Sequence, residues 1–178
     1  MSKEYKIDKT NRILYLSFFT AFAVTVYIFE ALIPKPLPFV RLGLANITIL
    51  FLLADGFPLL AFMVTILKVL VGGFFIGTLI SPVSLISLGG SIVSVIVMWL
   101  LLKSKLGLSL VGISVGGAIV HNLMQLVVLR LVLIQSDTVF KFIPLLLIIG
   151  LVSGIVTGII TLKIRERISF GANDGRVS

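Results

Sequence analysis

The chain has 178 residues, of which 58% are hydrophobic and only 12% are charged, and its net charge is +8. Soluble domains carry about 25% charged residues, so this chain has too little charge for a water-exposed surface, and lipid must solvate most of it. The absence of cysteine excludes disulfides, cysteine-ligated zinc and a thiol nucleophile, and the single histidine argues against a histidine-based metal site.

The first apolar run covers residues 13–33 and leads into a proline-rich loop. Roughly 20 apolar residues cross the hydrocarbon core as a helix, and backbone groups in lipid must be satisfied within their own segment. We therefore expect this run to span the membrane. Glu30 lies near its end, and small side chains recur every four residues in its first half, at Ser17, Ala21 and Thr25.

The second run, residues 42–54, is short for a crossing. It fits either a re-entrant segment or a short helix sheltered by the other helices. Arg41 and Asn46 bracket its start.

The remaining runs cover residues 58–79, 82–102, 110–134 and 142–162. Lys68 lies near the middle of the third run. His121, Asn122 and Gln125 lie near the middle of the fifth, and Arg130 follows them. A Lys or Arg at the bilayer centre costs roughly 2.5–3.5 kcal/mol, so such residues need a partner, a water-filled cavity or a ligand.

The basic residues decide between five and six spans. Four precede the first run, four follow the last, and two lie between the fourth and fifth runs, whereas three lie in the loops of the opposite face. Because basic residues concentrate on the cytoplasmic side, we expect an all-α bundle of six transmembrane helices in the cell membrane. Both ends would be cytoplasmic: a tail at 1–12, one membrane domain at 13–162 and a second tail at 163–178. This distribution indicates membrane topology rather than nucleic-acid binding.

Small residues also form stripes in the last three runs. In lipid, such residues let helix backbones approach closely, so we expect these stripes to pack within the bundle. The stripe of the first run lies in the cytoplasmic half, where a partner subunit could also dock. The later stripes are Ser84, Ser87, Ser91 and Ser94, then Gly112 and Gly116, then Gly150, Gly154 and Gly158.

The intramembrane polar residues are distributed unevenly. With this topology they all lie at the midplane or in the outer half, and their basic groups outnumber the single acid. We interpret them as a cavity that opens outward and suits an anionic or carbonyl-rich ligand. The alternative is a set of internal hydrogen bonds with a Glu30–Lys68 or Glu30–Arg41 ion pair. The candidate ligand-binding residues are Glu30, Arg41, Asn46, Lys68, His121, Asn122, Gln125 and Arg130.

Helical geometry subdivides this set. At 100° per residue, His121 and Gln125 lie about 40° apart and can share a site. Asn122 is about 100° round from His121, and Arg130 about 180°. Arg130 is therefore expected to face another neighbour or to reach outward toward the headgroups.

The sequence lacks the motifs of common catalytic sites. Its four aspartates (Asp8, Asp55, Asp137 and Asp174) are far apart, so there is no aspartate-rich motif for a magnesium diphosphate. There is also no G-x-x-x-x-G-K-[ST] phosphate loop, no G-x-S-x-G elbow and no H-E-x-x-H. We expect no enzyme activity from this chain alone, and neither a cofactor nor a metal.

Two motifs carry a resemblance to a known family: Arg41-Leu42-Gly43-Leu44-Ala45-Asn46-Ile47 and His121-Asn122-Leu123-Met124-Gln125-Leu126. Together with Glu30 and Pro34, the sequence Gly89-Gly90-Ser91 and the glycine-rich last run, they make nearly the whole chain resemble the family called heptaprenyl diphosphate synthase component I or Gx transporter. The chain departs from it at Lys68, where that family is expected to have arginine. Lysine keeps the charge but loses the bidentate geometry.

That family is in turn similar to the substrate-binding S components of energy-coupling factor transporters. The resemblance implies a six-helix fold, cytoplasmic termini and a ligand site near the outer face. It also implies a membrane T component that docks on Ser17, Ala21 and Thr25, and two cytoplasmic ATPases that hydrolyse ATP.

Three functions remain open on this basis. The first is an S component that captures a small vitamin-like or anionic metabolite. The second is a non-catalytic membrane accessory subunit of an isoprenoid (heptaprenyl) diphosphate synthase, as the family name says. The third is a structural membrane module whose buried polar residues pair only with one another.

Overall fold

The computed structural model describes residues 9–34, 42–104 and 106–174, and every regular element in these ranges is helical. The expected all-α class is therefore confirmed for the described chain. The elements are α1 (Lys9–Leu32), α2 (Asn46–Ala54), α3 (Pro58–Ile76), α4 (Pro82–Lys103), α5 (Leu110–Val132), the 3-10 helix η1 (Asp137–Phe142) and α6 (Ile143–Asp174).

The second element differs from a full span. Five of the described helices are long and apolar enough to cross a membrane, and α2 is not among them. Its nine residues make a helix of about 14 Å, roughly half the hydrocarbon thickness. The expected run 42–54 is helical only from Asn46 onward, because residues 42–45 take an irregular path with Gly43 at φ +81°. Of the two sequence alternatives, the short sheltered helix agrees with the structure.

Local chemistry explains where the other helices begin and end. Pro58 and Pro82 occupy the first positions of α3 and α4, where a missing N–H costs no hydrogen bond. The left-handed Gly77 ends α3. Ser109 caps α5 by accepting a hydrogen bond from the Gly112 backbone N–H at 3.2 Å. α1 starts before the expected residue 13, and α6 continues to Asp174, well past the expected residue 162.

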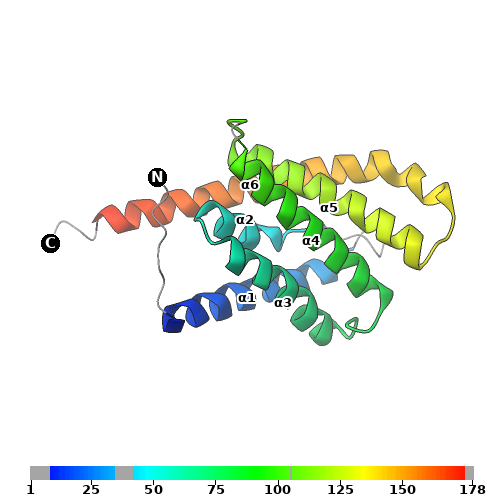
Figure 1. The fold of residues 1–178 in the computed structure, drawn as a ribbon, viewed down its shortest axis with the longest axis horizontal. Coiled ribbons are helices and arrows are strands. Elements are labelled where there is room, and N and C mark those ends of the chain that lie inside the picture. Colours follow the sequence, from blue (N-terminus) through cyan, green and yellow to red (C-terminus); the bar gives the residue numbers. More distant parts are fainter. Residues whose placement is uncertain (1–8, 35–41, 105, 175–178) are drawn as a thin grey trace.

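The start of α1 and the end of α6 lie at the same end of the bundle, on the left in Figure 1. Arg165 near the end of α6 contacts Asp55, which follows α2, at 2.8 Å. At this end also, Tyr15 of α1 lies 6.4 Å from Phe57, which precedes α3. The basic segments at both ends of the described chain therefore lie at the same end of the bundle, and the cytoplasmic location of that end stays a prediction.

The glycine stripe of α6 packs directly on α5. A Cβ added at Gly154 would lie 2.5 Å from the Val115 Cα, and one at Gly158 would lie 2.7 Å from the Val111 Cα. Such contacts leave no room for a side chain, so the predicted packing of this stripe within the bundle is confirmed. In the serine stripe of α4, Ser94 donates a hydrogen bond to the Gly117 carbonyl of α5 at 2.8 Å.

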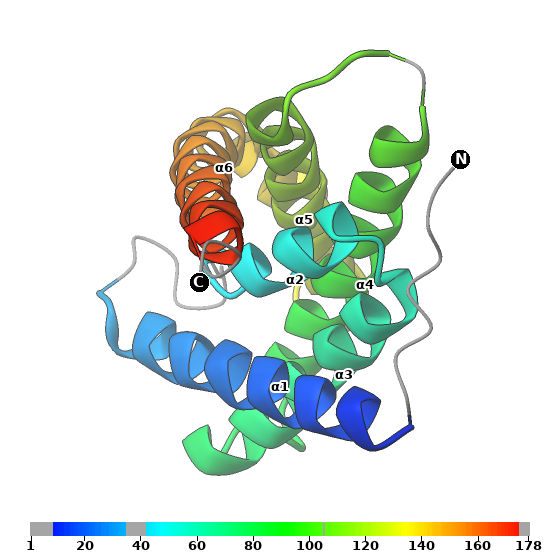
Figure 2. The same ribbon diagram turned by 90° about the vertical axis from the view of Figure 1, so that its left-hand side faces the viewer.

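α2 lies in the middle of the bundle, with α1 on one side and α5 and α6 on the other (Figure 2). Its side chains Ile49, Leu50 and Leu52 are fully buried and pack in one cluster with Val64 of α3 and Val95 of α4. Because the other helices shelter it, α2 can begin inside the bundle without exposing its backbone to lipid.

Candidate functional site

The site begins where the chain turns into α2. Glu30, buried near the end of α1, accepts hydrogen bonds from the backbone N–H groups of Gly43 at 3.0 Å and Leu44 at 2.9 Å. Both N–H groups belong to the irregular residues that lead into α2, and the carbonyl oxygens of the same two residues accept hydrogen bonds from Asn46 and Ile47 at the start of the helix. The Glu30 carboxylate thus fixes the turn that precedes α2, and its negative charge lies near the positive end of the helix dipole.

The next contact joins α2 to α3. The Lys68 ammonium, near the middle of α3 and only 1% exposed, donates to the Oδ1 atom of Asn46 at 2.7 Å. A charged amine at this depth is costly unless oxygen atoms solvate it. Asn46 supplies one such oxygen from the first residue of α2.

His121 and Gln125 of α5 form the third part of the site. Their Nε2 atoms are 3.1 Å apart and both side chains are buried. This separation fits a hydrogen bond between the amide and the imidazole, in which the donor depends on the tautomer of His121. A Cβ added at Gly43 would lie 3.6 Å from the His121 ring, so this pair lies beside the start of α2.

These contacts bring together five of the eight predicted ligand-binding residues, on α1, α2, α3 and α5. We call this group the central polar cluster: Glu30, Asn46, Lys68, His121 and Gln125. It offers an ammonium, several N–H donors and the positive end of a helix against a single carboxylate. Chemically, this arrangement suits oxygen-rich or anionic groups. Among the described residues, no group of three or more acidic or histidine side chains could hold a metal ion.

Of the other three predicted residues, two lie away from this group and the third falls outside the described residues. Asn122 is buried on another face of α5, where its amide donates to the Leu146 carbonyl of α6 at 3.1 Å. Arg130 is half-exposed and pairs with Asp137 of η1 at 3.0 Å. Arg41 lies outside the described residues. A ligand-binding role for Asn122 and Arg41 stays a prediction, whereas for Arg130, which pairs with Asp137 away from the cluster, we expect none.

Sequence reasoning did not assign a role to several groups near the site. Tyr27, one helical turn before Glu30, donates a hydrogen bond to Ser87 of α4 at 3.2 Å, and its ring packs where Gly72 leaves space. The sequence could have indicated this contact, because Tyr27 lies three residues before Glu30 on the same helix face and Ser87 belongs to the serine stripe. The N–H groups of Gly43 and Leu44 could not be predicted in this way, because they belong to the backbone.

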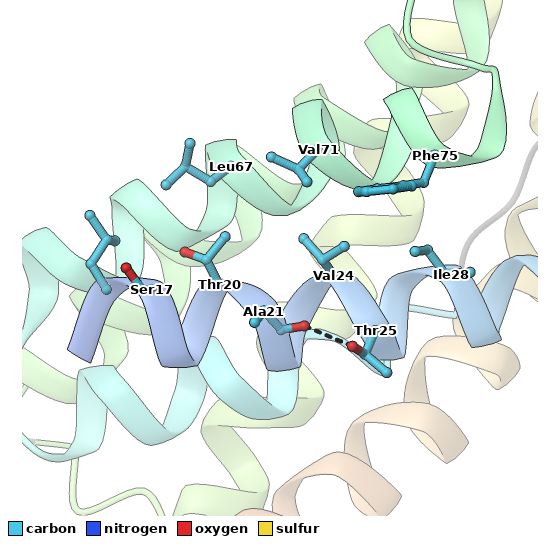
Figure 3. A pocket seen from close by; sticks show the side chains of 10 residues that line it. Ser17, Thr20, Ala21, Val24, Thr25, Ile28, Leu67, Val71 and Phe75 are labelled. Atoms are coloured by element: carbon cyan, nitrogen blue, oxygen red, sulfur yellow. Dashed lines mark hydrogen bonds between the residues drawn. The ribbon is translucent and has the colours of Figure 1, made fainter. Parts of the chain in front are cut away.

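The predicted docking residues lie on a different surface. Ser17, Ala21 and Thr25 are exposed along α1, and they line a groove of about 570 Å³ between α1 and α3 (Figure 3). The opposite wall comes from Leu67, Val71 and Phe75 of α3. Thr25 donates its hydroxyl hydrogen to the Ala21 carbonyl at 2.9 Å, which leaves the face of the groove largely apolar.

Comparison with known proteins gives one finding. The family described as heptaprenyl diphosphate synthase component I matches residues 19–164 of the chain. This range contains α2 to α5, every residue of the central polar cluster and most of the groove. No curated protein and no solved structure showed a significant match.

Proposed function

The chain belongs to the heptaprenyl diphosphate synthase component I family, and we propose that it is the substrate-binding membrane subunit, or S component, of an energy-coupling factor transporter. The observation that carries this proposal is the central polar cluster. Lys68 and four other polar side chains are buried around the start of a half-length helix. Ionisable residues within a membrane domain are rare and costly, and they indicate a functional site by default.

The chemistry of the cluster indicates the ligand class. Short helices that begin inside a membrane protein direct their positive ends at anionic substrate groups in transporters. Here that end lies beside Lys68, and the carboxylate of Glu30 accepts from the N–H groups of Gly43 and Leu44 just before the helix. A small vitamin-like or anionic metabolite with several oxygen atoms would use the same donors, and the predicted topology would admit it from the outer face.

The partners we propose are those implied by the similarity of this family to S components of energy-coupling factor transporters, and the sequence itself has no phosphate-loop motif. A membrane T component would dock along α1, and two cytoplasmic ATPases would supply the energy for uptake. The α1–α3 groove supports this, because its small residues at Ser17, Ala21 and Thr25 would let a partner helix approach closely. The chain itself would perform no catalysis and bind no cofactor.

A panel of anionic and carbonyl-rich metabolites tests the ligand site through the melting temperature of the detergent-purified chain. A ligand at a hundredfold excess over its Kd stabilises the folded state by about 2.7 kcal/mol. The wild type should show a clear shift with one class, and Lys68→Met should lose it. Arg130→Gln, outside the cluster, should keep it. No shift across the panel for a chain that purified empty would contradict the proposal.

The family description favours a second candidate, a membrane accessory subunit of an isoprenoid diphosphate synthase. Because the sequence has no aspartate-rich motif, catalysis would then belong to a soluble partner. Co-purification of a prenyl synthase, and faster chain elongation by that synthase when this chain is added, would favour this role over transport.

A further inference from the structure

α2 is connected to the rest of the chain through two left-handed glycines. Gly43 has φ +81° and Gly56 has φ +84°, a conformation that other residues adopt only with strain. Near the first glycine, the irregular residues 42–45 lead into the helix. α2 is therefore a separate rigid rod of about 14 Å, and contacts with other helices must fix its position.

The two ends of this rod are held by opposite charges. Just before its start, Glu30 accepts hydrogen bonds from the N–H groups of Gly43 and Leu44, in the turn whose carbonyl oxygens bind the first helical N–H groups. At its end, Arg165 of α6 donates to the Ala54 carbonyl at 3.3 Å and to the Asp55 carboxylate at 2.8 Å. Each charge complements the helix dipole at the end it contacts. Arg165 belongs to the part of α6 that continues beyond the predicted membrane span.

We propose that Arg165 and Asp55 are positioning residues for the central polar cluster and that they act through α2. A rod held at both ends transmits a displacement from one end to the other, because its hydrogen-bonded backbone does not compress. Loss of the Arg165 contact should loosen the far end of α2, where Gly43, Leu44 and Asn46 meet Glu30, Lys68 and His121. An effect of Arg165 on ligand binding rests on the proposed function. The link from Arg165 through α2 to Gly43 and Leu44 does not.

The competing explanation is that packing alone holds α2. Ile49, Leu50 and Leu52 are fully buried in the core, and a well-packed core could keep the helix in place without Arg165. In that case, loss of Arg165 would disturb only the residues next to Asp55.

Hydrogen–deuterium exchange of the ligand-free, detergent-purified chain separates these explanations. In Arg165→Gln, peptides that contain Gly43 and Leu44 should exchange about two- to fivefold faster than in the wild type. Arg165→Lys keeps the charge at the Ala54 carbonyl and should restore part of the protection. Peptides from the α5–α6 contact around Gly154 should be unchanged, which excludes general destabilisation.

The chain offers a matched control in Arg130→Gln. This change breaks the other arginine–aspartate pair, whose arginine side chain is 40% exposed against 38% for Arg165, but it does not touch α2. It should leave exchange at Gly43 and Leu44 unaltered. If Arg165→Gln does not fold, Asp55→Asn removes only the carboxylate and should give a smaller acceleration at the same peptides.

Unchanged protection at Gly43 and Leu44 in a folded Arg165→Gln or Asp55→Asn variant would overturn the inference, and so would equal acceleration in Arg130→Gln. Since no ligand is present, the result stands even if the metabolite panel shows no binding. Failure of this inference and failure of the proposed function are thus distinguishable.

Discussion

At the scale of single residues, the hydrogen bond between Asn46 and Lys68 bears most directly on whether the central polar cluster serves structure or function. It joins a buried ammonium to a buried amide at 2.7 Å. Removing one partner of such a bond leaves the other polar group in a poorly solvating environment. Replacing both partners with apolar groups leaves no buried polar group that needs a hydrogen bond.

Asn46→Leu should therefore lower the free energy of unfolding by about 1.5–3 kcal/mol. The double variant Asn46→Leu/Lys68→Met should regain much of this loss but lose the ligand-induced rise in melting temperature. Unfolding in mixed detergent micelles measures the first quantity, and the metabolite panel measures the second. A double variant that is as unstable as the single one would mean that Lys68 contributes to the fold through other contacts.

For Arg130, in contrast to Asn46 and Lys68, we expect substitution to have little effect. Its pair with Asp137 is half-exposed, and such pairs are worth about 0–1 kcal/mol. Arg130→Ala should leave both stability and ligand binding nearly unchanged, as measured by the melting temperature with and without ligand. Loss of binding would restore Arg130 to the ligand-binding residues that the sequence predicted.

These two cases show what the sequence could predict about the site. A polar residue in an apolar run is visible because its insertion is costly, so Glu30, Lys68, His121 and Gln125 were identifiable as one set. Their hydrogen-bond partners were not, because the N–H groups of Gly43 and Leu44 belong to the backbone. Helical geometry placed Arg130 on the opposite side of its helix from His121. The two residues were nevertheless predicted to belong to one site, because that prediction used only their polarity and their depth in the membrane.

At the scale of elements, the contact between α5 and α6 depends on glycine. A Cβ at Gly154 would lie 2.5 Å from the Val115 Cα, and only a backbone shift can relieve such a clash. Gly154→Ala should cost about 1–3 kcal/mol of unfolding free energy. Gly112→Ala is the control, since its Cβ would make ordinary contact, at 3.7 Å from Ser109. Equal melting temperatures for the two variants would contradict the close packing of these helices.

α2 was the hardest element to predict. The apolar run 42–54 shows no feature that separates its irregular residues 42–45 from its helical part, apart from Gly43. The early start of α1 and the long continuation of α6 were missed for another reason. Hydropathy marks where lipid ends, whereas a helix continues as long as its backbone bonds and side-chain pairs stabilise it.

At the scale of the whole molecule, the predicted topology can be tested with introduced thiols because the chain has no cysteine. Ser104 follows α4 and Ser136 follows α5, so α5 separates them. In intact cells, an impermeant maleimide should label Ser136→Cys, and should label Ser104→Cys only after permeabilisation. Labelling of both introduced cysteines in intact cells would contradict the prediction that α5 spans the membrane. Labelling of Ser104→Cys alone in intact cells would contradict the prediction that the termini are cytoplasmic.

The most direct test of the account is native mass spectrometry of the detergent-purified chain, with small molecules extracted from the same sample. We predict a stoichiometric metabolite, anionic or rich in carbonyl oxygens, that is lost from His121→Ala and retained by Arg130→Ala. An empty chain that purifies with a prenyl synthase would contradict the binding function and favour the accessory subunit.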